Sequence, residues 1–124
     1  MIDFNNSTFV KLNQINPADV HSTIGPLLIA NEQLWLAAKG IRDYVVFTSK
    51  RIIVVNVQGI TGKKQDFTSL PYSKIQAFSV ETSGTFDRDS ELELYFSGLG
   101  KVRLEFGSTV DIRGVAKLIA DQVL

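Results

Sequence analysis

The sequence contains no cysteine and only one histidine among its 124 residues. Without cysteine, the chain forms no disulfide and offers no thiolate to a metal ion or to an electrophile. A single histidine, His21, and scattered acids assemble neither a Ser-His-Asp arrangement nor a histidine cluster nor a pair of catalytic carboxylates. These absences predict a protein that is not an enzyme and that uses no metal or other cofactor.

An excess of charge and a long apolar run are also missing. Thirteen Lys and Arg residues balance thirteen Asp and Glu residues, so net charge does not favour nucleic acid or an anionic membrane as a partner. No window approaches the ~18 apolar residues of a membrane-spanning helix, and no basic segment followed by an apolar run opens the chain. At 44% hydrophobic residues, we expect one compact domain that is soluble and cytoplasmic.

Strand-forming residues dominate the middle of the chain. β-Branched and aromatic residues, which favour extended backbone, gather in short runs between turn signals, most densely in residues 42–72. Seven strands are predicted within residues 33–107, at about 33–41, 44–47, 51–58, 63–70, 75–82, 91–96 and 101–106.

The last two predicted strands form a hairpin whose register follows from its charges. A register with opposed residue numbers summing to 196 places Glu93 opposite Arg103, Glu91 opposite Glu105 and Tyr95 opposite Lys101. A sum of 198 loses the ion pair of Glu93 with Arg103 and still leaves two acids opposed. We therefore favour the sum of 196.

One helix is predicted before the strands in the sequence and one after them. Asn16-Pro17 is a helix start, and an apolar stripe follows in residues 16–30, which Gly25-Pro26 ends or kinks. Ser108 or Thr109 caps a final amphipathic helix in residues 109–124. Residues 1–15 show neither the apolar periodicity of a helix nor the alternation of a strand. They are predicted to be a loosely ordered arm before a domain at residues 16–124.

The order of these elements predicts a mainly β fold. Seven short antiparallel strands curl into a barrel or an orthogonal sandwich, and a terminal helix covers its open end. This is the pleckstrin-homology (PH) arrangement, with a short N-terminal helix in addition.

Several short motifs resemble one family. In their combination and spacing, they are similar to the small single-domain bacterial PH-like proteins, over about residues 32–124. The resemblance implies a seven-stranded barrel with a C-terminal helix, an uncharacterised molecular role and assembly into closed homo-oligomeric rings. The family commonly opens with a Gly-rich apolar segment, whereas this chain has an Asn-rich stretch at residues 5–14. The motifs are RD at 42–43, FTSKR at 47–51, QGITGKK at 58–64, PYSKI at 71–75, ETSG at 81–84 and DSEL at 89–92.

The residues favour a protein-interaction module that binds to itself. Ile52 to Val55 are apolar at consecutive positions, so both faces of their strand must be covered, the outer one by the N-terminal helix or by another subunit. We expect a homo-oligomer, closed by cyclic symmetry because an unclosed contact would polymerise, and possible binding of another protein. The candidate interface residues are Trp35, Tyr44, Ile53, Val55, Phe78 and Val80.

The alternative is a module for an anionic ligand or a lipid headgroup. Its candidate residues lie in basic turns, at opposite ends of adjacent strands, and meet only if the twist of the barrel brings them together. The connection at residues 40–43 is too short to resemble the basic clamp of phosphoinositide-binding PH domains, so neither phosphoinositide nor membrane binding is expected. Arg42 is expected to form a salt bridge with Asp43 or a neighbour. The candidate anion site consists of Arg42, Lys50, Arg51, Lys63 and Lys64.

Two further motifs are interpreted as structural. Asp87, Asp89 and Glu91 alternate like calcium ligands, but the glycine and the terminal glutamate of a calcium loop are missing. Residues 59–64 superficially resemble a phosphate-binding loop, but they have the wrong glycine spacing. We predict that the acids restrain the next strand and that the glycines serve a turn.

Overall fold

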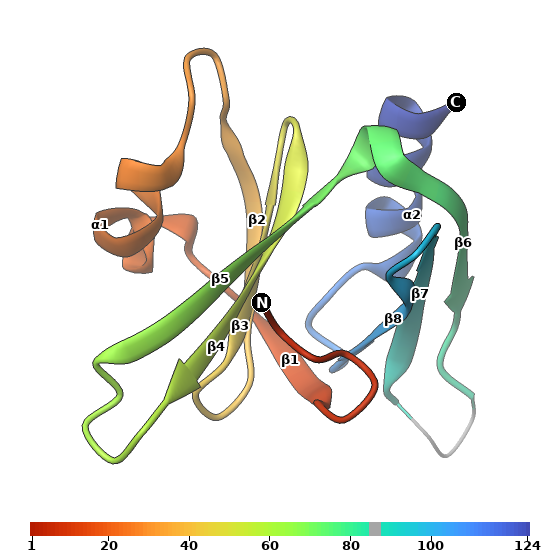
Figure 1. The fold of residues 1–124 in the computed structure, drawn as a ribbon. Helices are drawn as coiled ribbons and strands as arrows, with labels where there is room; N and C mark the ends of the chain where they lie inside the picture. Colours follow the sequence, from red (N-terminus) through yellow and green to blue (C-terminus); the bar gives the residue numbers. More distant parts are fainter. Residues whose placement is uncertain (85–87) are drawn as a thin grey trace.

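The computed structural model describes residues 1–84 and 88–124. Over these residues it is mainly β, with a short N-terminal helix and a C-terminal helix, as predicted (Figure 1). The strands in chain order are β1 (Phe9–Ile15), β2 (Leu34–Lys39), β3 (Tyr44–Thr48), β4 (Arg51–Gln58), β5 (Lys64–Pro71), β6 (Ile75–Glu81), β7 (Ser90–Phe96) and β8 (Gly100–Phe106). The helices are α1 (His21–Ile24) and α2 (Ile112–Val123), with 3-10 turns at Pro17–Asp19, Gly25–Leu27 and Tyr72–Lys74.

All eight described strands lie in one sheet, in the order β5-β4-β3-β2-β1-β8-β7-β6. Figure 1 shows the sheet bent into two halves, with β2 to β5 on one side and β6 to β8 on the other. The strand β1 joins them, because its residues 13–15 pair antiparallel with β2 and its Phe9 and Leu12 align in parallel with β8. β5 and β6 are the two opposite ends of this order and do not pair with each other, so the barrel stays open between them.

The prediction of a loose arm at residues 1–15, and hence of seven strands, was wrong. Ile2, Phe9 and Leu12 are all at most 6% exposed and belong to the core. Phe9 and Leu12 face inward although they are three residues apart, because the register shifts between them and Lys11 has a φ of 53°. This bulge interrupts the two-residue alternation that identifies a strand, so the pattern in the sequence was lost.

The main core lies between the two halves of the sheet. Phe47 and Phe106 pack within it with ring centroids 6.2 Å apart, and α2 contributes Ile112, Val115 and Ile119. Fully burying each such side chain contributes roughly 1.5–3 kcal/mol. The helix thus covers the barrel as predicted.

The N-terminal cap of α2 differs from the prediction. The carboxylate of Asp111 accepts a hydrogen bond from the Gly114 amide at 3.2 Å, so the helix begins at Ile112. The hydroxyl of Thr109 instead accepts from the Gln14 amide at 3.0 Å and donates to Asn13 Oδ1 at 3.1 Å. Thr109 therefore ties the start of α2 to β1.

A second apolar cluster lies on the outer face of β3 and β4. Val20 and Ile24, from the α1 region, cover Ile53 and Val55 there. The apolar run at residues 52–55 required a cover on the outer face of its strand, either the N-terminal helix or another subunit. In the structure, the N-terminal helix is this cover. That helix is shorter than residues 16–30, because Asn16 caps a 3-10 turn at Pro17–Asp19 and another 3-10 turn carries Gly25-Pro26.

The β7–β8 hairpin has the predicted register. Glu93 is paired with Arg103, Glu91 with Glu105 and Tyr95 with Lys101. The ion pairs, however, run diagonally between the strands: Arg103 contacts Glu91, and Lys101 Nζ lies 3.4 Å from Glu93 Oε2. Diagonal neighbours lie within reach of long side chains, so each cation pairs with the glutamate diagonal to it and not with the residue directly opposite.

Candidate functional site

Three of the predicted interface residues lie inside the domain. Ile53 and Val55 are fully buried, Tyr44 is 6% exposed, and all three belong to the cluster under α1. Burial raises the pKa of the Tyr44 hydroxyl, although a hydrogen bond with Thr23 opposes the effect. Because the same chain already covers these side chains, they are not available to another subunit.

The other three interface candidates do not form one outer surface. Trp35 is 40% exposed and lies where the pairing of β2 with β3 is irregular. Phe78 and Val80 are half-buried and pack against the main core, so they are on the inner face of β6 and not on its outer face. Trp35 alone among the six is substantially exposed.

The candidate anion site is divided between the two ends of β4. Lys50 precedes the strand and Arg51 begins it, whereas Lys63 and Lys64 follow its other end. Eight residues of strand place these groups about 25 Å apart. Arg42 lies with the lysines of the β4–β5 turn, because its Nη2 donates to the carbonyl of Gly59.

Arg51 is committed to a buried network. Its guanidinium binds both carboxylate oxygens of Glu32, Nε to Oε2 at 2.9 Å and Nη2 to Oε1 at 3.0 Å, and also donates to the carbonyl of Leu27. The Glu32 side chain is fully buried. Burial opposes its ionisation, but hydrogen bonds from Arg51, Thr48 and the Ile29 amide outweigh it and lower the pKa of Glu32. Arg51 is therefore a structural residue and not a ligand for an external anion.

Asp43 does not pair with Arg42. Its Oδ1 accepts from the Val57 amide at 2.8 Å and from Asn56 Nδ2 at 3.2 Å, which fastens the β2–β3 turn to the end of β4. Gly59 and Gly62 have φ angles of 75° and 69° in the turn that leads into β5. The glycines thus serve a turn between two strands, and no helix follows as a phosphate-binding loop requires.

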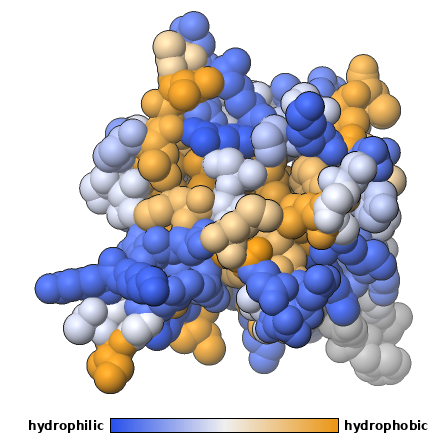
Figure 2. All heavy atoms as spheres, viewed as in Figure 1, coloured by the Kyte–Doolittle hydropathy of each residue, from blue (hydrophilic) through white to orange (hydrophobic). Residues whose placement is uncertain are grey.

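Two isoleucines protrude from neighbouring turns at this end. Ile41 in the β2–β3 turn is 97% exposed and Ile60 in the β4–β5 turn is 105% exposed. Arg42 bridges the two turns through Gly59. Apolar protrusions beside hydrophilic side chains are visible where these turns lie, at the lower left of Figure 2. We define the turn surface as Val10, Lys11, Ile41, Arg42, Ile60, Lys63 and Lys64.

A depression of about 270 Å³ lies beside the turn surface. Val10 and Lys11 of β1 line one side of it, and Ile41 and Arg42 line another. The sequence pointed to Arg42 and the lysines but not to the isoleucines. The available signal was an isolated large apolar residue at the centre of each of two predicted turns.

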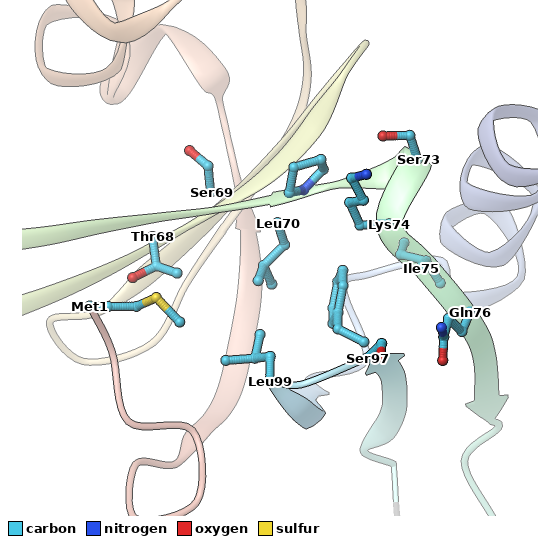
Figure 3. A pocket seen from close by; sticks show the side chains of 12 residues that line it. Met1, Thr68, Ser69, Leu70, Ser73, Lys74, Ile75, Gln76, Ser97 and Leu99 are labelled. Carbon is cyan, nitrogen blue, oxygen red and sulfur yellow. The ribbon is translucent and has the colours of Figure 1, made fainter.

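A groove lies between β5 and β6, the two end strands of the sheet, which do not pair with each other. We call it the sheet-edge groove. It has a volume of about 370 Å³. Leu70 of β5, Ile75 of β6 and Phe96 of β7, each at most 6% exposed, line it together with Leu99. Figure 3 shows Leu70 and Leu99 pointing toward each other across it. Sequence reasoning missed this groove because its walls are brought together only by the bend of the sheet.

The outer face of β6 to β8 is acidic. Glu81 pairs across the strands with Glu91, and Glu91 with Glu105. The pKa of Glu105 is raised by burial and by its hydrogen bond with Asp89. Of the three alternating acids that we interpreted as structural from the sequence, Asp87 lies outside the described residues. In the part of the chain that the structure describes, no three His, Asp or Glu residues are grouped to hold a metal ion.

These features can be compared with known proteins. A family model described as the bacterial PH domain matches residues 3–123. The chain belongs to this family. Within the described ranges, this PH domain has no helix long and apolar enough to cross a membrane.

Two curated relatives come from Bacillus subtilis strain 168. The uncharacterized protein YjqA is 44% identical over 108 residues, which are 86% of each chain. The uncharacterized protein YozO is 31% identical over 93 residues, or 75% of this chain and 80% of that protein.

Solved structures confirm the PH fold. A DUF1696 family protein with a PH domain from Shewanella loihica PV-4 is 42% identical with a TM-score of 0.82, over 93% of this chain and 99% of that one. A PH domain from Shewanella amazonensis SB2B is also 42% identical, with a TM-score of 0.68 over 90% and 91% of the chains. A PH-domain protein from Exiguobacterium sibiricum 255-15, at 20% identity and a TM-score of 0.65 over 88% and 58%, shows likeness of fold alone.

Proposed function

We propose that this PH domain is a non-catalytic interaction module that associates with copies of itself. The supporting observation is the turn surface, where Ile41 and Ile60 are almost fully exposed on adjacent turns. Burying an isoleucine contributes roughly 1.5–3 kcal/mol, which these two side chains do not gain within one chain. Exposed apolar side chains grouped in this way are typical of a surface that another molecule covers.

The distribution of charge supports a second copy as that molecule. The turn surface carries four cations and no acid, whereas the outer face of β6 to β8 carries four glutamates and two cations, namely Glu81, Glu91, Glu93, Glu105, Lys101 and Arg103. The basic turn surface of one copy therefore complements the acidic outer face of β6 to β8 on another, where Tyr95 is 47% exposed. Since two different surfaces meet, the contact is heterologous, and it yields a closed ring if the rotation between copies closes.

The native mass tests this proposal. Light scattering behind a sizing column, at micromolar chain concentration and low salt, is expected to give an integral multiple of 13.7 kDa that stays constant as concentration rises. Added salt should shift the mass toward one chain, because exposed charges are screened within ~10 Å at 0.1 M ionic strength. A mass of one chain at every concentration and salt level refutes self-association.

A second candidate function is binding of an anionic ligand or lipid headgroup at the turn surface. Arg42, Lys63 and Lys64 gather at one end of β4, and among the described residues none of them forms an ion pair. Sedimentation with phosphatidylserine vesicles measures this binding. Binding that weakens with salt and is lost in Lys63→Glu/Lys64→Glu supports it, whereas equal sedimentation with neutral vesicles contradicts it.

A further inference from the structure

The free edges of β5 and β6 border the sheet-edge groove. These two strands are the ends of the sheet order, so among the described strands β5 pairs only with β4 and β6 pairs only with β7. An unpaired edge presents backbone N–H and C=O groups that can pair with another strand. Figure 2 shows apolar side chains at the centre of this face, between the two halves of the sheet. An apolar groove thus lies directly beside free backbone groups.

The backbone groups at the free edge of β5 can be assigned. The Tyr72 amide donates to the carbonyl of Lys50 at 3.3 Å, so Tyr72 directs its N–H toward β4. Hydrogen-bonding residues alternate along an antiparallel strand, so Leu70 and Thr68 also direct their backbone groups toward β4. Ser69 therefore turns both its N–H and its C=O to the free edge. Pro71 has no N–H, but its backbone groups do not face β4, so the pairing of β5 with β4 loses no hydrogen bond there.

The floor of the groove suits an apolar side chain. Leu70, Ile75 and Phe96 are almost buried, and Leu99 is half-exposed above them. In Figure 3, Leu70, Ile75 and Leu99 come from different segments and surround one gap. A strand added to a sheet places alternate side chains on one face, so a segment paired with β5 directs every second side chain at this floor.

The charge of the groove indicates a second feature of its ligand. Lys74 is the one charged side chain among the twelve lining residues, and no lining residue is acidic. The other positive group is the α-ammonium of Met1, which is paired with Asp66 at 3.0 Å. Lys74 is exposed and forms no ion pair with a described residue. A carboxylate on the bound segment complements this ammonium group, whereas a lysine or arginine there is repelled.

We infer that the sheet-edge groove binds an extended peptide segment of another protein. The segment adds as a strand to β5 at Ser69, places an apolar side chain over Leu70, Ile75 and Phe96, and directs an aspartate or glutamate at Lys74. Main-chain hydrogen bonds supply affinity, and the apolar floor of the groove and the Lys74 ammonium group supply specificity. This inference does not depend on self-association through the turn surface.

The first test removes one backbone donor. Fluorescently labelled, blocked hexapeptides of alternating threonine and leucine, with one aspartate placed at each position in turn, are titrated against the full chain by anisotropy. Ser69→Pro removes the N–H that faces the free edge, and Ser69→Ala is the matched control that loses the same hydroxyl but retains the N–H. We expect Ser69→Pro to weaken the best peptide at least about tenfold and Ser69→Ala to change it less than about twofold. Equal affinities of the two variants overturn the inference.

The second test reverses the charge preference. Lys74→Glu should lower affinity for the aspartate peptides and raise it for matched lysine peptides. If Ser69→Pro does not fold, as judged by circular dichroism, peptides methylated at backbone nitrogens serve instead and should lose binding. Absence of saturable binding by any peptide up to about 1 mM, a range in which even weak specific contacts register, overturns the inference. The native mass of each variant, recorded in parallel, reports separately on self-association.

Discussion

Arg51 Nε and Nη2 each lie within 3.0 Å of a different carboxylate oxygen of Glu32, so the two side chains form a bidentate pair. The pair joins the segment that follows α1 to the first residue of β4. The Thr48 hydroxyl adds a hydrogen bond to Glu32 Oε2 at 2.6 Å, and the Tyr72 hydroxyl donates to the Thr48 carbonyl at 2.8 Å. Because every partner is at least partly buried, removing one leaves the others unsatisfied.

Glu32→Gln is expected to lower the free energy of unfolding by roughly 3 kcal/mol, since it leaves the Arg51 charge without its partner in a largely buried site. Urea unfolding of both proteins at pH 7 measures the difference. Glu81→Gln, at an exposed position of β6, is the control and should change stability by less than about 0.5 kcal/mol. A Glu32→Gln variant as stable as this control would contradict the role of the pair.

The stabilisation by Glu32 should depend on pH. Its pKa is lower in the folded protein than the ordinary value of 4.5, so folding favours the ionised form. The contribution is therefore fully present above pH 4.5 and is lost as the pH falls through the lower folded pKa. The difference in unfolding free energy between the wild type and Glu32→Gln should shrink across this acidic range. A difference that is constant down to acid unfolding would refute the expectation.

Leu12→Ala tests whether β1 is a structural strand. Leu12 is 1% exposed in the main core, so the substitution should cost about 2–5 kcal/mol through lost burial and the cavity it leaves. Val10→Ala is the control on the same strand, because Val10 is 46% exposed. Thermal and urea unfolding measure both. Similar small losses for the two variants would instead indicate a loose arm.

Ile24→Ala tests the cover of the outer face of β4. Ile24 is fully buried against the cluster that contains Ile53 and Val55, so its truncation should cost about 2–5 kcal/mol at any protein concentration. Leu27→Ala, two-fifths exposed nearby, should cost much less. If the loss of stability depended on chain concentration, another subunit and not α1 would be the cover.

Ile41→Ser/Ile60→Ser tests the turn surface. Both side chains are exposed, so stability should change by less than about 0.5 kcal/mol, while the native mass in light scattering should fall toward one chain. Ile29→Ser is the matched control, since Ile29 is 62% exposed beyond the opposite end of β2. An unchanged mass in the double variant would exclude the turn surface from the contact.

Local patterns in the sequence determined much of the fold. Alternation of apolar and polar residues placed β7 and β8 and limited their registers to those that keep the apolar set inward, because a shift by one residue would turn that set to solvent. The opposed charges then selected the sum of 196 among these registers, which the structure has. Consecutive apolar residues at 52–55 correctly required a cover on both faces of β4. Motif spacing then identified the family, which the comparisons confirmed.

Only the tertiary structure decided where the surfaces are. The bulge near Lys11 concealed β1, and the choice of α1 as the cover removed Tyr44, Ile53 and Val55 from the candidate interface. The turn surface and the sheet-edge groove each combine segments that are distant in sequence. Periodicity reports which face of a strand is apolar, but it does not report which other segment lies against that face, because long-range packing determines that choice.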